Sequence, residues 1–139
     1  MKHGVEDGSS IDVAPKKVFF LPQKPYNIPG SLRLQIMYPL YKDDNGLNRA
    51  LTTKSQHVSD RYLLDILHSV RLGDLAARVG DGDEIAGLAK CADWSKILSV
   101  GEQQRLSFAR AVYNNPSVII LDESTSGDLT SLFSLYVEV

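Results

Sequence analysis

The sequence predicts an α/β domain in which helices connect the strands of a parallel sheet. Two apolar runs, Lys17–Leu21 and Ser117–Leu121, predict strands, and the second has the continuous apolar character of a parallel strand covered on both faces. Between these runs, apolar residues recur at helical spacing. A length of 139 residues, with 43% hydrophobic and 23% charged residues, is typical of one globular domain.

The N-terminal part of the chain predicts an arm, a strand, a loop and a short helix. Residues 1–17 are rich in Gly, Ser and Asp and predict a loose arm. The strand that follows is closed by Pro22, and Gln23–Gly30 is predicted to be a loop stiffened by prolines. Ser31 is placed to act as the N-cap of a helix that extends to Met37.

The middle of the chain predicts two further helices. Residues 42–57 are polar and predict a surface loop, after which Ser59 or Asp60 is expected to cap a helix. Residues 75–79 predict a second short helix, and the acidic, glycine-rich residues 80–87 predict a turn. The apolar residues of the first helix recur at near-helical spacing: Leu63, Leu64, Leu67, Val70 and Leu72.

The most informative stretch is LSVGEQQRLSFARAVYNNPSVIILDE, residues 98–123. The polar segment Ser99-Val100-Gly101-Glu102 opens a helix that extends to Tyr113, and the free N–H groups at such a helix end favour an anion such as a phosphate. Asp122 and Glu123 emerge from the strand that follows, at the sheet edge where α/β proteins bind ligands. This combination favours nucleotide and Mg²⁺ chemistry.

These residues carry a resemblance to the ATP-binding-cassette (ABC) ATPases. LSVGE resembles the signature loop of that family, VIILDE its Walker B strand, and Val18–Pro39 its Q-loop segment. The amino-acid sequence of these motifs, with Trp94 before the signature, is most similar to that of subfamily D half-transporters and their bacterial relatives. The resemblance implies an incomplete RecA-like P-loop NTPase core with the ABC helical subdomain over residues 18–128, followed by a divergent tail at 129–139.

The resemblance also implies roles for single residues, with ATP and Mg²⁺ as cofactors. Asp122 would hold Mg²⁺ and Glu123 would orient or deprotonate the attacking water. Gln23 would bridge Mg²⁺, that water and the transport domain. The signature residues would contact the γ-phosphate of ATP: Ser99, Val100, Gly101 and Glu102.

Each of these residues also has a purely structural interpretation. Ser99 and Gly101 could be an N-cap and a turn glycine, and Asp122-Glu123 could be a solvated strand exit. Gln23 could be an ordinary polar loop residue. Trp94 is interpreted as a core residue.

Two motifs of the ABC family have no counterpart in this sequence. None of the ten glycines is followed by lysine, so there is no Walker A loop to hold the β- and γ-phosphates. All three histidines precede Asp122, so the switch histidine is also missing. Val100 replaces the usual glycine of the signature, and Asp128 lies one place early for the D-loop. We therefore expect no ATP hydrolysis by this chain alone.

The function implied is part of the ATP-hydrolysing domain of an ABC transporter that drives transport of acyl lipids or a related substrate. The alternative is a non-catalytic variant that pairs with an intact half-transporter and regulates it. The partners expected are a second nucleotide-binding domain and a transmembrane domain, at the soluble face of a peroxisomal, plastid or bacterial inner membrane. A net charge of −2 does not favour nucleic acid as a partner. A chromosome-maintenance ATPase would carry heptad repeats, which the sequence lacks.

Overall fold

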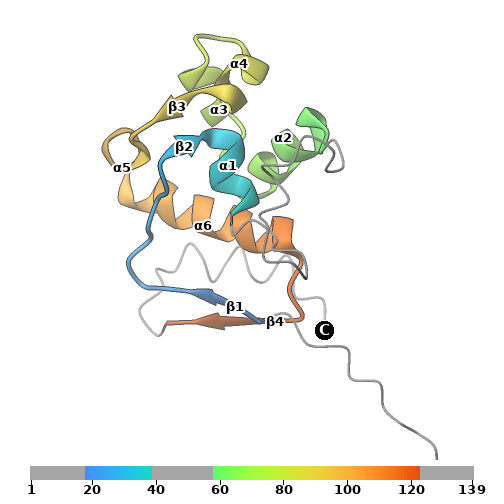
Figure 1. The fold of residues 1–139 in the computed structure, drawn as a ribbon, viewed down its shortest axis with the longest axis vertical. Coiled ribbons are helices and arrows are strands. Elements are labelled where there is room, and N and C mark those ends of the chain that lie inside the picture. The colour runs from blue at the N-terminus through green and yellow to red at the C-terminus, as the bar shows by residue number, and fades with distance from the viewer. Residues whose placement is uncertain (1–17, 39–57, 123–139) are drawn as a thin grey trace, which may run out of the picture.

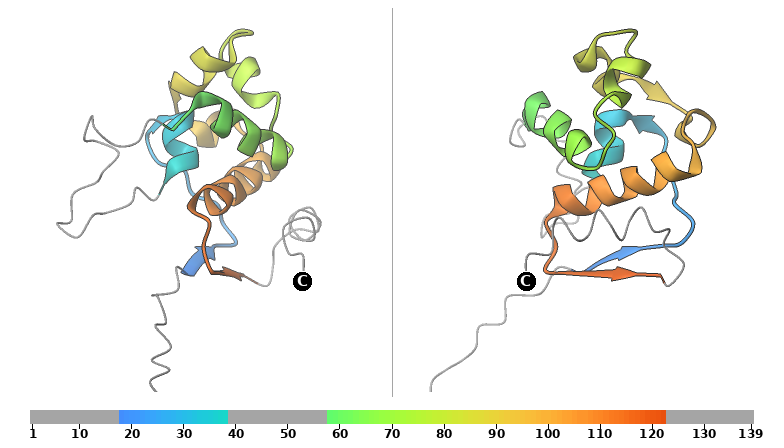
Figure 2. Two further views of the ribbon diagram at one scale, coloured as in Figure 1. Left: turned by 90° about the vertical axis from the view of Figure 1, so that its right-hand side faces the viewer. Right: turned by 180° about the vertical axis from the view of Figure 1, so that it is seen from behind.

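The computed structural model describes residues 18–38 and 58–122. Figure 1 shows a small sheet formed by β1 (Val18–Leu21) and β4 (Val118–Leu121), with the described helices gathered on one side of it. The long helix α6 (Val100–Asn114) lies next to the sheet, and the other helices form a lobe beyond it. The two views of Figure 2 show the same order of layers.

The sheet confirms the prediction that the two apolar runs are parallel strands of one sheet, and it shows that they are direct neighbours. Val18 pairs with Val118, and the register continues without interruption to Leu21 and Leu121. The prediction that the second strand is covered on both faces is wrong. Val118 and Ile120 are 39% and 47% exposed, because the described helices cover only one face of the sheet.

The helices begin where polar side chains satisfy their free N–H groups. Helix α1 (Leu32–Met37) is capped by Ser31, whose Oγ accepts a hydrogen bond from the N–H of Leu34. Helix α2 (Asp60–Ser69) is capped in the same way by Ser59. The C-cap of helix α6 is Asn115, which adopts the left-handed conformation with φ of 43° and precedes a proline.

The region predicted as an acidic turn contains a helix instead. Helix α3 (Leu75–Val79) is found as predicted, but α4 (Glu84–Ala89) follows it after a short turn. Asp83 explains the difference, because its carboxylate accepts hydrogen bonds from the N–H groups of both Ile85 and Ala86. Gly87 lies against the backbone of Ala76, so this glycine allows α4 to pack closely on α3.

Two short elements complete the lobe. Strand β2 (Gly30–Ser31) pairs antiparallel with β3 (Cys91–Ala92), and this pairing joins the start of α1 to the segment before α5 (Trp94–Ile97). Trp94 is 1% exposed and confirms its interpretation as a core residue. The core around it includes every apolar residue of the predicted α2 pattern, all buried: Leu63, Leu64, Leu67, Val70 and Leu72.

Several predictions concern residues outside the described ranges. These are the N-terminal arm at 1–17, the surface loop at 42–57, the D-loop region and the divergent tail at 129–139. Within the described residues, no helix is both long and apolar enough to cross a membrane.

Candidate nucleotide and partner site

The carboxyl ends of β1 and β4 bring two of the predicted site residues together. Leu21 pairs with Leu121, and the N–H of Asp122 donates a hydrogen bond to the carbonyl of Leu21 over 3.4 Å. Gln23 lies two residues beyond Leu21, so its backbone is within roughly 7 Å of that carbonyl. Gln23 is exposed and Asp122 is half-buried. Glu123, the predicted catalytic carboxylate, lies outside the described residues.

The donors at this edge fit Mg²⁺ in kind. A carboxylate and an amide oxygen are hard ligands, and Mg²⁺ in nucleotide sites is held by one or two such groups together with waters and phosphate oxygens. In residues 18–38 and 58–122 there is no group of three or more His, Cys, Asp and Glu side chains that could hold a metal alone.

The predicted signature residues form the N-cap and the first turn of α6. Ser99 is the N-cap of α6. Val100 is the first helical residue, and its side chain is 66% exposed. The Oγ of Ser99 accepts from the N–H of Glu102, and the carboxylate of Glu102 accepts from the N–H of Ser99, which is a capping box. The N-cap interpretation of Ser99 is therefore confirmed.

Gly101 has no structural reason, within the described residues, to be glycine. A Cβ built at Gly101 would meet no atom within 4 Å, so the space beside the first turn of α6 is open. Glycine in a helix costs about 0.5–1 kcal/mol relative to alanine. The open space lets another molecule approach the backbone of this turn closely.

The carboxylate of Glu102 links this helix start to α3. It accepts a hydrogen bond from Arg78 over 2.7 Å in addition to the bond from Ser99. Burial alone raises the pKa of Glu102, but these two bonds and the charge of Arg78 outweigh burial and place the pKa below its usual value.

Acid should therefore weaken the fold through Glu102. Since the folded-state pKa is depressed, the carboxylate contributes stability above the unfolded-state pKa of about 4.3, and this contribution is lost as pH falls through the folded-state pKa. We expect Glu102→Gln to flatten the dependence of the free energy of unfolding on pH between about 5 and 3. Urea titrations at several pH values across this range measure the free energy of unfolding. Asp65→Asn, which changes an exposed carboxylate, is the matched control. Equal pH slopes in wild type and Glu102→Gln would contradict the assignment.

The strand ends and the helix start lie on the same side of the molecule. Figure 1 shows β1 and β4 ending on the side where α6 begins. The loop that follows β1, Gln23–Gly30, is bonded to the first turns of α6, because Asn27 Nδ2 donates a hydrogen bond to Gln103 Oε1 over 2.9 Å. Among the described residues, no hydrogen bond or ion pair joins Ser99, Gly101 or Glu102 directly to Gln23 or Asp122.

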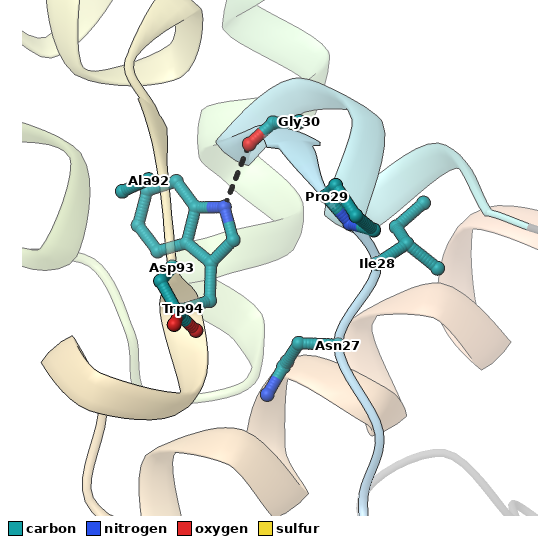
Figure 3. A pocket seen from close by; sticks show the side chains of 7 residues that line it. All are labelled: Asn27, Ile28, Pro29, Gly30, Ala92, Asp93 and Trp94. Atoms are coloured by element: carbon teal, nitrogen blue, oxygen red, sulfur yellow. Dashed lines mark hydrogen bonds between the residues drawn. The ribbon is translucent and has the colours of Figure 1, made fainter.

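A pocket of about 440 Å³ opens between this loop and the segment that leads to α5. Figure 3 shows Asn27, Ile28 and Pro29 on one wall and Asp93 and Trp94 on the other, with Trp94 Nε1 bonded to the carbonyl of Gly30. The walls are held in place by four polar side chains that belong to none of the predicted motif roles: Asn27, Gln35, Gln103 and Arg110. A polar residue within an apolar stretch was the available signal for Gln35 and Arg110.

A comparison with known families shows the family to which the chain belongs. The family model described as "ABC transporter" matches residues 10–126, which is most of the chain.

The chain belongs to the ABC transporter family.

Its relatives include several sub-family D transporters. The mouse "ATP-binding cassette sub-family D member 3" is 39% identical over 110 residues, which is 79% of this chain and 15% of that protein. The "Lysosomal cobalamin transporter ABCD4" of mouse is 39% identical over 117 residues, or 83% of this chain and 17% of its own length. An "Uncharacterized ABC transporter ATP-binding protein" of Synechocystis is 40% identical over 120 residues, or 86% and 15%. The chain thus spans about a sixth of these ABC transporters and corresponds to part of their ATP-binding domain.

Proposed function

We propose that this chain is the part of a sub-family D ATP-binding domain that completes an ATP site on a second nucleotide-binding domain. The observation that carries the proposal is the first turn of α6, where Gly101 leaves open space beside a helix start. The N–H groups of such a turn favour a phosphate, and a glycine permits its close approach. In this proposal, the phosphates that this turn meets are those of ATP bound by the partner domain.

At the sheet edge, the proposal assigns metal and water contacts. Asp122 would hold Mg²⁺ together with the amide oxygen of Gln23, and Glu123 would orient or deprotonate the water that attacks the γ-phosphate. When bound, Mg²⁺ neutralises charge on the phosphate oxygens. The half-burial of Asp122 and its position beside the start of the Gln23 loop support this assignment.

A further partner in this proposal is the transmembrane domain of the transporter. The chain would then lie at the face of the membrane from which the ATP-binding domains project. Gln23 lies at the start of the loop that lines the pocket of Figure 3, and this surface is a candidate contact with the transmembrane part. The proposed substrate is an acyl lipid or a related molecule, which that transmembrane part would contact.

The proposal is tested by measuring whether this chain binds a full-length transporter only when ATP is present. The chain is co-expressed with a full-length sub-family D transporter, and the amount that co-purifies is measured with and without Mg-ATP. We expect association in ATP only, and Gly101→Ala should lower it by about tenfold or more, because a methyl group would fill the space the phosphate needs. Gly101→Ala should leave the fold intact, since the added Cβ meets no atom of the described chain.

Two controls make the result decisive. Ile85→Ala removes an exposed side chain of α4 away from this turn and should leave association unchanged. The chain alone should show no ATP turnover, because the sequence has no Gly-Lys pair. Association that is equal with and without ATP, or is unaffected by Gly101→Ala, would contradict the proposal. A fall in the partner's ATPase rate on association would instead indicate a regulatory role.

A further inference from the structure

Arg110 is a buried cation that the proposed ATP chemistry does not use. It lies in the C-terminal half of α6 and is 2% exposed. In the described residues no carboxylate lies within ion-pair distance of its guanidinium. Its partners are oxygens of the N-terminal segment: Nη1 donates to the carbonyl of Tyr26 over 2.8 Å, and Nε donates to the carbonyl of Gln35 over 2.6 Å. A buried charge is costly unless such bonds satisfy it.

Gln35 extends this grip to the next residues of the loop. Its Oε1 accepts from Arg110 Nη2 over 3.1 Å and from the N–H of Ile28 over 3.1 Å. Its Nε2 donates to the carbonyl of Ile28 over 2.7 Å. Arg110 and Gln35 together therefore bind the backbone of Tyr26 and Ile28, within the loop that starts at Gln23.

Two aromatic rings fix the guanidinium in place. Its carbon lies 5.4 Å from the centroid of the Tyr26 ring and 5.9 Å from that of Tyr38, and the two rings meet edge to face. Only arginine offers several donors in one rigid plane that can also stack on aromatic rings. Lysine at this position could reach one of these carbonyls but could not hold the loop at several points.

We propose that Arg110 is a positioning residue that locks the loop after Gln23 onto α6, so that the loop and the signature helix move as one body. The consequence rests on the proposed function: a displacement of the Ser99–Glu102 end of α6 by a partner's ATP would be carried to Gln23 and to the pocket wall at Asn27 and Ile28. The lock itself is a property of this chain and needs no nucleotide.

Pulsed electron paramagnetic resonance tests the lock on the whole chain. The chain has one cysteine, so Cys91→Ser provides a background for spin labels at Lys24→Cys, next to Gln23, and Ala86→Cys on α4. We expect a narrow distance distribution that broadens by at least about twofold in Arg110→Met, because the charge-assisted bonds to the loop are lost. Arg110→Lys should give an intermediate width.

A second label pair separates positioning from general stability. Labels at Ala86→Cys and Lys96→Cys both lie in the helical lobe, and their distance should not change in Arg110→Met. Arg61→Met replaces an exposed arginine of α2 and should change neither distance. If Arg110→Met does not fold, Gln35→Met cuts the Ile28 part of the grip and should broaden the loop distance alone.

The changes in the two label distances distinguish a lock of the loop from a general loss of stability. Broadening of the Lys24 distance alone supports the lock. Unchanged widths in Arg110→Met and Gln35→Met, or equal broadening of both label pairs, would overturn it. Since no ATP or partner is present, this result is independent of the association experiment.

Discussion

Trp94→Ala should destabilise the fold by about 3–5 kcal/mol, the usual loss for a large aromatic residue removed from a core. Trp94 is 1% exposed and belongs to the main hydrophobic core. Its Nε1 donates to the carbonyl of Gly30 over 2.9 Å, which joins the segment before the signature to the end of the Gln23 loop. Urea unfolding followed by circular dichroism measures the loss, since this is the only tryptophan and fluorescence would vanish with it.

Two further variants divide this effect into its parts. Trp94→Phe keeps an aromatic ring but leaves the carbonyl of Gly30 without its donor, and it should cost about 1–3 kcal/mol beyond the loss of ring volume. Ile97→Ala in the same helix alters a side chain that is 46% exposed, and it should change stability by less than about 0.5 kcal/mol. Trp94→Ala and Ile97→Ala with equal stability would show that the tryptophan is not central to the core.

Gly87→Ala should reverse the usual benefit of replacing a helical glycine by alanine. A Cβ at Gly87 would clash with the carbonyl oxygen of Ala76 and would lie 2.6 Å from its carbonyl carbon. Both are backbone atoms of α3, so α3 and α4 must move apart, at a cost of at least about 2 kcal/mol.

Gly101→Ala is the matched variant with the opposite sign. It also places a methyl group on a helical glycine, but in open space, and it should raise stability by about 0.5–1 kcal/mol. Thermal unfolding of the two variants side by side checks the contrast. A Gly87→Ala protein at least as stable as Gly101→Ala would mean that α3 and α4 do not approach each other this closely.

The helices predicted correctly are those that local chemistry determines. Helix α2 has an apolar face and a serine cap within ten residues, and α6 has a capping box, so neither depends on distant segments. The parallel pairing of β1 and β4 was predictable because two apolar runs ended in polar residues suited to the same edge. Asp122 also lies beside the end of β1, two residues before Gln23, but the shared role of Gln23 and Asp122 at Mg²⁺ stays a prediction.

The elements that were missed depend on tertiary contacts. Helix α4 contains glycine and follows an acidic turn, and Gly87 is favourable there only because the backbone of Ala76 lies against it. The short strands β2 and β3 are visible only through their pairing across the lobe. The bonds from Arg110 to Tyr26 and from Asn27 to Gln103 join residues far apart in the sequence, so no local pattern encodes them.

The register of the sheet also determines the order in which this chain can fold. Since Val18 pairs with Val118, forming the sheet first would close a loop of about 100 residues, an entropic cost of roughly 4 kcal/mol. Four residue pairs without cover on one face cannot repay that cost by themselves. The helical lobe must therefore form first and bring the two strands together. Folding should be slow for a chain so rich in helix, and the sheet should be the first part to open when the lobe is weakened.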